Sequence, residues 1–265
     1  MNTIVDWDRD TPQWSAVLAA TKDCGRTGAS SANTLWPLYA PLVEVPAGQN
    51  VVIGQLGQSL DGRIATPTGH SHYINGVAAL VHLHRLRALV DAVVVGVGTV
   101  VADDPQLTVR RAERREGVAQ PARVVIDPRG RMPPEAKCLA DDGARRIVIQ
   151  AGAKPAARSG VEYISVQPLD GAMAPRLILA ALAERGVRRI LVEGGANTLS
   201  RFLSAGCLNR LHIAVAPIII GSGPVGIDLA AIDCLDDALR PRVTSFALPD
   251  GEVLFDCAFS AKASP

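Results

Sequence analysis

The stretch RRILVEGGANTLSRFL, residues 188–203, decides the fold expected of this chain. Arg188 to Val192 read as a buried strand, and a helix is expected to open directly after Gly194-Gly195. Backbone N–H groups at the start of a helix have no partner within the helix, so they suit an anion such as the pyrophosphate of a nucleotide cofactor. The pattern therefore predicts a nucleotide-using enzyme.

The segments around this stretch predict alternating strands and helices. Strand, helix and strand in succession imply a crossover between parallel strands. The chain therefore predicts an α/β fold with a mostly parallel central sheet, helices on both faces, and antiparallel edge strands at the C-terminus. The predicted strands are 51–56, 92–97, 122–126, 146–150, 162–166 and 188–192, the predicted helices are 75–90 and 175–185, an apolar run covers 211–220 around Pro217, and a hairpin joins 243–246 to 252–259 through a turn near 249–251.

Residues 1–49 differ from the rest and are predicted to be an N-terminal extension to one catalytic domain, residues 50–265. They contain one short predicted helix, 11–21, followed by Gly, Ser, Asn and Pro residues typical of loops. On composition this segment is interpreted as a peripheral arm for packing or for contact with another subunit.

Composition narrows the classes of function. Twenty-seven basic residues balance 26 acidic ones, so no global field favours nucleic acid or an anionic membrane. Five cysteines without a CxxC pair favour neither a zinc ribbon nor disulfides, and no metal is expected. The N-terminus lacks a signal-like apolar stretch, and no window reaches about 18 apolar residues, so a cytoplasmic location is predicted.

Polar segments at the predicted strand ends are candidates for chemistry, because ligands of open sheets collect at the carboxyl ends of the strands. Each segment also has a plain structural interpretation, either a glycine turn or a solvated, salt-bridged loop. The segments are GQSLDGRIAT from Gly57, GHSHYING from Gly69, ADDPQLTVR from Ala102, and RVVIDPRGR from Arg123, whose Arg129 and Arg131 suit the 2′-phosphate of NADP. Only half of a GxGxxG motif occurs, at Gly96 and Gly98, which disfavours an ordinary Rossmann dehydrogenase.

Five motifs in order give the chain a resemblance to a known family. SLDGRIA, HLHRLRALVDAVVVGVGTVVADDPQLTVR, RVVIDPRGR, LVEGGANTLSRFL and APIIIGSG resemble the reductase domain of bacterial riboflavin biosynthesis, the C-terminal half of a bifunctional pyrimidine deaminase and reductase. The resemblance covers roughly residues 50–259 and implies a dihydrofolate-reductase-like fold. It implies that NADPH reduces the ribosyl group of 5-amino-6-(5-phosphoribosylamino)uracil to a ribityl group, and it implies a homodimer. A homodimer is also expected because residues 211–220 read as an exposed apolar edge of the sheet, which needs cover.

The resemblance also implies site residues. Asp103 and Glu193 are the candidates for proton transfer, although either could only hold ribose hydroxyls. The implied cofactor-side positions are Gly57, Tyr73, Thr99, Asp103, Pro128, Gly195, Ala196, Asn197, Thr198, Leu199, Ser200 and Arg201. The implied substrate-side positions are Ser71, Arg87, Leu107, Arg110 and Glu193, with the serine and arginines suited to a 5′-phosphate.

Departures from the family pattern leave alternatives open. Family members often carry Lys at Gln55, Trp at Tyr73 and Ser at Pro128, so a paralogue that reduces a pterin or another heterocycle is the second hypothesis. A third is a non-catalytic nucleotide-binding protein, which retention of Asp103, Arg110 and Glu193 disfavours. The zinc-deaminase signature, HxE followed by PCxxC, does not occur, so reduction without deamination is expected.

Overall fold

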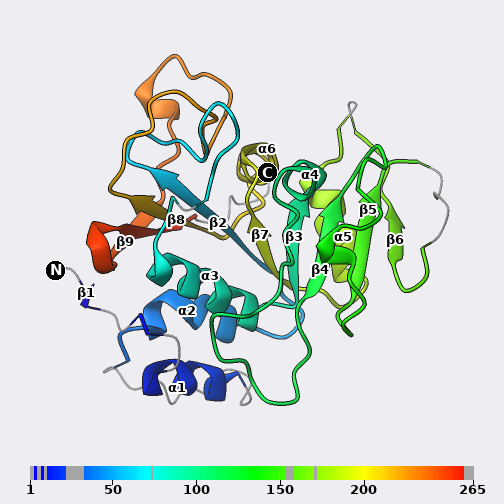
Figure 1. The fold of residues 1–265 in the computed structure, drawn as a ribbon, viewed down its shortest axis with the longest axis horizontal. Helices are drawn as coiled ribbons and strands as arrows, with labels where there is room; N and C mark the ends of the chain where they lie inside the picture. The colour runs from blue at the N-terminus through cyan, green and yellow to red at the C-terminus, as the bar shows by residue number, and fades with distance from the viewer. Residues whose placement is uncertain are drawn as a thin grey trace.

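A computed structural model describes residues 3–4, 7–8, 11–21, 33–72, 74–152, 158–169 and 172–259. Ten strands in these residues form one sheet, in the order β1-β9-β10-β8-β2-β7-β3-β4-β5-β6 (Figure 1). Their bounds are β1 Thr3–Ile4, β2 Val51–Ser59, β3 Ala92–Gly96, β4 Ala122–Ile126, β5 Arg146–Gln150, β6 Glu162–Ser165, β7 Arg189–Glu193, β8 Arg210–Ala216, β9 Arg242–Ala247 and β10 Val253–Ala258.

The sheet is parallel from β8 through β6, and β10 pairs in antiparallel fashion with both β8 and β9. This confirms the predicted mostly parallel sheet with antiparallel C-terminal strands. One expectation is wrong: the apolar run 211–220 was expected at an exposed edge that needs cover. Its strand, β8, lies between β10 and β2 inside the sheet, and the edge on that side is the two-residue β1. A run buried on both faces and an apolar edge look alike in sequence.

Helices cover both faces of the sheet, and each face has its own apolar core. The helices are α1 Pro12–Ala20, α2 Trp36–Val43, α3 Val77–Leu89, α4 Val97–Asp103, α5 Pro175–Ala183 and α6 Ala196–Ser204. Buried side chains of α1 to α4 form one core, and those of α5 and α6 form the other. Val93 and Val95 of β3 face the first core while Val94 faces the second, as the two-residue period of a strand requires.

The N-terminal residues contribute a layer to the first core. Figure 1 shows α1, α2 and α3 stacked on the same side of the sheet. Trp14 of α1 and Tyr39 of α2 are completely buried, with ring centroids 5.3 Å apart. Helix α2 was not predicted, because Pro37 and Pro41 read as loop residues; Pro37 instead occupies the first turn, where a missing N–H costs nothing. The boundary at residue 49 stays a prediction.

A buried polar chain fastens α2 and α3 to the sheet. The hydroxyl of Tyr39 lies 2.9 Å from Nδ1 of His82, whose Nε2 lies 3.0 Å from Nδ1 of His212. Behind His212, Asp256 is 3.3 Å away and is also paired with Arg210. Burial raises the pKa of Tyr39, so its hydroxyl stays a donor. The Tyr39–His82 and His82–His212 contacts are both satisfied when the two imidazoles are neutral.

The buried polar chain of Tyr39, His82 and His212 predicts that the protein loses stability in mild acid. Burial, and then the nearby His212 and Arg85, hold the pKa of His82 well below its usual range. In the unfolded chain His82 therefore binds a proton at about pH 6.5, whereas in the folded protein it stays neutral at that pH. As the pH is lowered past about 6.5, we expect the free energy of unfolding to decrease by up to ~1.4 kcal/mol per pH unit. Urea titrations between pH 7.5 and 5 measure this decrease.

The matched control is His82→Gln, which keeps a donor and an acceptor but does not titrate. The variant is expected to be less stable at pH 7.5 and to lose most of the slope between pH 6.5 and 5. An unchanged slope would contradict the assignment of the acid sensitivity to His82. Tyr39 from α2, Arg85 from α3, and His212 and Asp256 from the sheet are the charged or titratable groups that surround it.

No helix in the described part of the chain has both the length and the apolar character needed to cross a membrane.

Candidate active site

Two clefts adjoin at the carboxyl ends of the central strands, and the first has a volume of about 630 Å³. Its walls are the turn from β3 into α4, the start of α6, the segment after β4, and the region before α5. The residues that line it are Gly96, Val97, Gly98, Thr99, Ile126, Pro128, Arg129, Arg131, Ala151, Pro168, Ala172, Met173, Pro175, Ile178, Gly195, Ala196, Asn197, Thr198, Arg201 and Phe202.

Glycines bring the backbone of α6 close to α4 in this cleft. Gly194 and Gly195 have φ of 51° and 67°, which only glycine adopts without strain. A Cβ on Gly195 would lie 2.7 Å from Oγ1 of Thr99, and one on Gly96 would lie 2.4 Å from Oγ1 of Thr198. No side chain caps the start of α6. The helix therefore presents its first N–H groups at the cleft, as an anion site requires.

The charge of this first cleft is positive. Arg129, Arg131 and Arg201 line it, and no carboxylate is among the described residues that line it. Asp127, which is buried at the end of β4, accepts hydrogen bonds from the backbone N–H of Arg131 and of Met132, both at 2.9 Å. This carboxylate fixes the turn that carries Arg129 and Arg131. The cleft fits an anionic dinucleotide in both its charge and its free amides.

The second cleft, of about 540 Å³, contains a buried ion pair. Arg87 of α3 donates from Nε and Nη2 to the two carboxylate oxygens of Glu193, at the end of β7, each at 2.6 Å. Nη1 of Arg87 also donates to the carbonyl of Thr108 at 2.9 Å. A guanidinium has five N–H groups, so two stay available for a ligand. Both oxygens of Glu193 already accept a bond, which favours a positioning role over proton donation.

A strained loop forms another wall of the second cleft. Asp104 and Leu107 have φ of 41° and 56°, unusual values for residues with a Cβ. The loop is held by three further contacts: Nδ1 of His84 accepts from the N–H of Arg110, Gln120 bonds both backbone groups of Val109, and Oδ1 of Asp104 accepts from the N–H of Lys137. Strain of this kind occurs where surrounding structure holds a functional loop in place.

A row of polar side chains crosses the sheet on the face that α3 covers. Glu193 of β7, Gln55 of β2, His212 of β8 and Asp256 of β10 are in register as direct neighbours. Gln55 and Glu193 line the second cleft, whereas His212 and Asp256 are buried beyond it. The substrate-side polar groups are therefore continuous with the buried polar chain that fastens the helices.

The two clefts meet at α4 and at the glycine pair. Thr99 lines both, and Gly194 lines the second cleft while Gly195 lines the first. Two ligands, one in each cleft, would therefore meet at Thr99 and the glycine pair. This arrangement suits a transfer reaction between two bound molecules.

The structure gathers most of the predicted site residues into these clefts. The first cleft contains seven predicted cofactor-side residues: Thr99, Pro128, Gly195, Ala196, Asn197, Thr198 and Arg201. The second shares Thr99 and contains five further predicted residues: Arg87, Asp103, Leu107, Arg110 and Glu193.

Other predicted residues lie elsewhere. Gly57 does not line either cleft; the amide of Asn75 occupies the place of its Cβ, at 2.0 Å. Leu199 is buried in the core, and Oγ of Ser200 accepts a bond from the N–H of Asp228. Ser71 lies next to His72, which lines the second cleft. Tyr73 is outside the described residues.

Sequence reasoning missed several lining residues. Met173 reaches the first cleft from the segment before α5, and Pro175 and Ile178 reach it from the start of α5. Lys137 reaches the second cleft from a 3₁₀ turn, Lys137–Leu139. None of them follows a strand directly, so the strand-end rule could not find them. The alternation of strands and helices predicted α5 itself but not which of its residues face a ligand.

Comparison with known proteins gives a family match. The model of the RibD C-terminal domain matches residues 50–244. The chain is 36% identical over 204 residues to the riboflavin biosynthesis protein RibD of Mycobacterium tuberculosis, and the match covers 77% of this chain and 53% of that protein. It is 34% identical over 197 residues to the 2,5-diamino-6-ribosylamino-4(3H)-pyrimidinone 5′-phosphate reductase of Methanothermobacter thermautotrophicus, covering 71% of this chain and 88% of that protein. The chain thus spans about half the length of the first relative and most of the second.

Solved structures agree in fold. RibD of Acinetobacter baumannii superposes with a TM-score of 0.70 at 29% identity, over 87% of this chain and 64% of that one. The riboflavin biosynthesis reductase Rib7 of Saccharomyces cerevisiae superposes with a TM-score of 0.66 at 20% identity, over 85% of this chain and 99% of that one. The second likeness supports the fold alone.

Proposed function

Because this chain belongs to the RibD C-terminal domain family, the pyrimidine reductases of riboflavin biosynthesis, we propose that it uses NADPH to reduce the ribosyl group of a 5′-phosphorylated ribosylaminopyrimidine to a ribityl group. The preferred substrate is 5-amino-6-(5-phosphoribosylamino)uracil. The observation that carries the proposal is the meeting of a positive, amide-lined cleft with a second polar cleft at Thr99 and Gly194-Gly195.

The first cleft is the proposed NADPH site. The N–H groups at the start of α6 hold the pyrophosphate, and Arg129 and Arg131 are near enough to the same cleft to bind the 2′-phosphate. When bound, the nicotinamide supplies the hydride that goes to C1′ of the sugar. Thr99 and the glycine pair position its reactive end, because they border both clefts.

The second cleft is the proposed substrate site. Arg87, held by Glu193, and Arg110 bind anionic or hydroxyl groups of the sugar phosphate. Asp103, the last residue of α4, is the group we propose for proton transfer, since Glu193 is fully engaged by Arg87. We assign Glu193 the role of orienting Arg87.

Purified protein should oxidise NADPH in the presence of the uracil substrate and form the ribitylamino product. The 2-amino analogue, the substrate named for the Methanothermobacter relative, is the comparison that fixes the base specificity. Turnover of a dihydropterin in place of both would favour the paralogue hypothesis. NADPH binding without turnover of any ribosylated pyrimidine or pterin would favour a non-catalytic protein.

Cofactor choice has its own test in Arg129→Gln. The change removes one cation from the first cleft and leaves the bonds of Asp127 to the neighbouring backbone in place. We expect the KM for NADPH to rise roughly tenfold, since a charge-assisted hydrogen bond contributes about 1.5–3 kcal/mol. The KM for NADH, which lacks the 2′-phosphate, should not change. An equal rise in KM for both cofactors would contradict the binding of the 2′-phosphate by Arg129.

We propose that the protein is a homodimer in the cytoplasm. Large exposed apolar side chains in the segment between β8 and β9 support an interface there; the most exposed are Ile219, at 77%, and Leu235, at 76%. Sedimentation at micromolar concentration tests the stoichiometry.

A further inference from the structure

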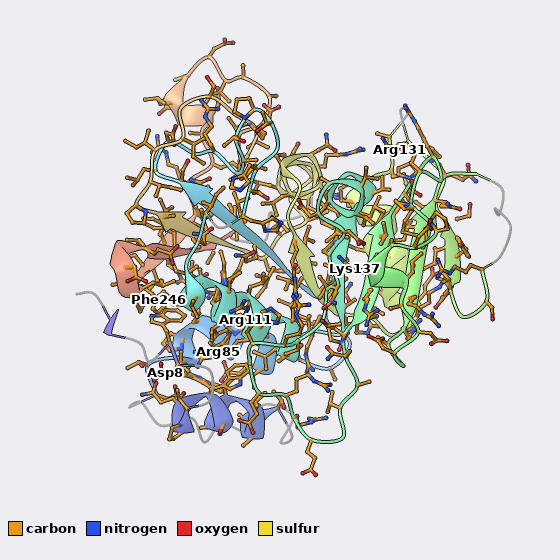
Figure 2. The ribbon with its side chains drawn as sticks, in the orientation of Figure 1. Asp8, Arg85, Arg111, Arg131, Lys137 and Phe246 are labelled. Atoms are coloured by element: carbon orange, nitrogen blue, oxygen red, sulfur yellow. The ribbon has the colours of Figure 1, made fainter. Side chains whose placement is uncertain are left out.

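Lys137 is a cation of the substrate-side cleft that belongs to none of the motifs. It is the only lysine in the described part of the chain, where arginine supplies the other basic side chains. It opens the 3₁₀ turn Lys137–Leu139 and lines the second cleft together with Arg87 and Arg110. Figure 2 labels Lys137 beside β3 and β4.

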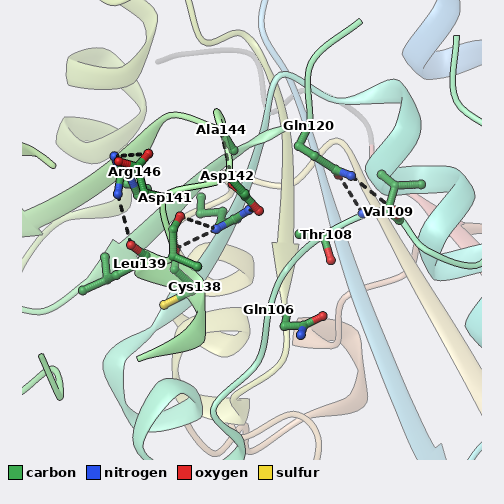
Figure 3. A network of polar contacts seen from close by, with 12 residues as sticks. Gln106, Thr108, Val109, Gln120, Cys138, Leu139, Asp141, Asp142, Ala144 and Arg146 are labelled. Atoms are coloured by element: carbon green, nitrogen blue, oxygen red, sulfur yellow. Dashed lines mark hydrogen bonds and ion pairs between the residues drawn. The ribbon is translucent and has the colours of Figure 1, made fainter. Parts of the chain in front are cut away.

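The turn that carries Lys137 is fixed from below by two buried arginines. Arg123 donates from Nη1 to the carbonyls of Cys138 and Ala140, at 3.3 Å and 3.2 Å, and is paired with Asp142. Arg146 donates to the carbonyl of Leu139 at 3.2 Å and to Asp141 at 2.9 Å (Figure 3). The backbone of residue 137 therefore has a defined place, although its side chain is exposed.

The ammonium group is loosely held by comparison. It pairs with Oδ2 of Asp104, at 3.1 Å, and the two side chains are 57% and 44% exposed. Water screens an ion pair of this exposure, so exchanging Asp104 for a stronger anion costs little. The carboxylate of Asp104 keeps a hydrogen bond when the ammonium leaves, because its Oδ1 also accepts from the backbone N–H of Lys137 at 2.8 Å.

The charges of the second cleft leave room for a phosphate. Glu193 neutralises Arg87 through two bonds of 2.6 Å. Within the described residues, Arg110 bonds the neutral groups of Gln106 and Thr108 in its own loop. Asp103 is a further carboxylate that lines the cleft. A phosphate dianion on Arg110 alone would keep an uncompensated charge. One further mobile cation completes its neutralisation, and a lysine serves as a point charge for phosphate.

We propose that Lys137 binds the 5′-phosphate of the substrate jointly with Arg110, and that its ammonium leaves Asp104 when the phosphate arrives. Lys137 is thus a specificity residue that distinguishes phosphorylated from unphosphorylated ribosylamino substrates. This inference rests on the proposed function and names the group that this end of the second cleft recognises.

The first experiment compares Lys137→Met with Lys137→Arg. Lys137→Met should raise the KM for the phosphorylated substrate about tenfold, leave kcat within about twofold, and leave the KM for NADPH unchanged. Its effect should vanish with the unphosphorylated ribosylamino substrate. Lys137→Arg should restore most of the affinity. An equal loss on both substrates, or no loss on either, would overturn the proposal.

The second experiment uses a change of opposite sign. In Asp104→Asn the amide oxygen still accepts from the N–H of Lys137, and Asn tolerates the left-handed backbone, but the competing charge is gone. The KM for the phosphorylated substrate should fall, by up to about threefold. A KM that rises would mean that Asp104 and Lys137 only brace the loop, and that result would contradict the exchange of partners.

A binding measurement separates this proposal from the proposed function. Calorimetry with ribose 5-phosphate should detect binding to the intact protein, with affinity about tenfold weaker in Lys137→Met and no comparable binding of ribose. This result would support the phosphate site even if no pyrimidine were reduced. Turnover of the pyrimidine with ribose 5-phosphate binding unaffected by Lys137→Met would uphold the proposed function and overturn the role of Lys137.

Discussion

Arg87→Met is expected to destabilise the protein by about 3–5 kcal/mol and to lower kcat/KM roughly a hundredfold or more. The change leaves the carboxylate of Glu193 buried without its partner, and removal of one member of a buried ion pair is costly for that reason. The activity falls further because a charge-assisted bond to the substrate contributes about 1.5–3 kcal/mol. Urea unfolding and steady-state kinetics with NADPH measure the two effects.

A double variant separates the two effects. Arg87→Met with Glu193→Leu removes both charges together, and replacing a buried pair by apolar side chains is often neutral for stability. We expect the double variant to recover most of the lost stability while it stays as inactive as the single variant. If activity returned with stability, the ion pair would have only a structural role and the substrate site would lie elsewhere.

Gly195→Ala is expected to raise the Kd for NADPH by roughly ten- to a hundredfold. The new Cβ would lie 2.7 Å from Oγ1 of Thr99, at a backbone φ of 67° that costs a non-glycine residue about 1–2 kcal/mol. Relief of the clash shifts the start of α6, whose N–H groups are the proposed pyrophosphate site. Fluorescence titration with NADPH gives the affinity, and thermal unfolding gives the stability.

Gly206→Ala is the matched control. It lies just past the other end of α6, with a φ of 64° and nothing within 4 Å of the added Cβ. Both variants should lose similar stability through the backbone, but only Gly195→Ala should lose NADPH. Equal affinities for NADPH in the two variants would contradict the binding of the cofactor at the start of α6.

Much of the fold could be predicted from sequence because the signals are local. Strands β4 and β5 were predicted to the residue, and α5 was predicted to within two residues, since proline at its start and Gly186 after its end mark a helix clearly. Helix α4 was not predicted. Its seven residues follow β3 without a break, and the glycines in VGVG read as a turn.

The position of β8 could not be predicted, because strand order is a property of long-range pairing. The chain passes from β2 through five further strands before β8 returns to pair with it. Residues 213–216 are apolar whether such a strand lies inside the sheet or at its edge. The ion pair of Arg87 with Glu193 was missed for the same reason: 106 positions separate the partners.

The in-register row of Glu193, Gln55, His212 and Asp256 ties chemistry to folding. Successive side chains of a strand point to opposite faces. Inserting or deleting one residue of β2 before Gln55 would therefore turn Gln55 away from α3 and bring Gly54 or Leu56 into its place. The same insertion or deletion would also disrupt the apolar core on the opposite face of the sheet. Evolution along this strand must therefore proceed by exchange of side chains and not by change of length.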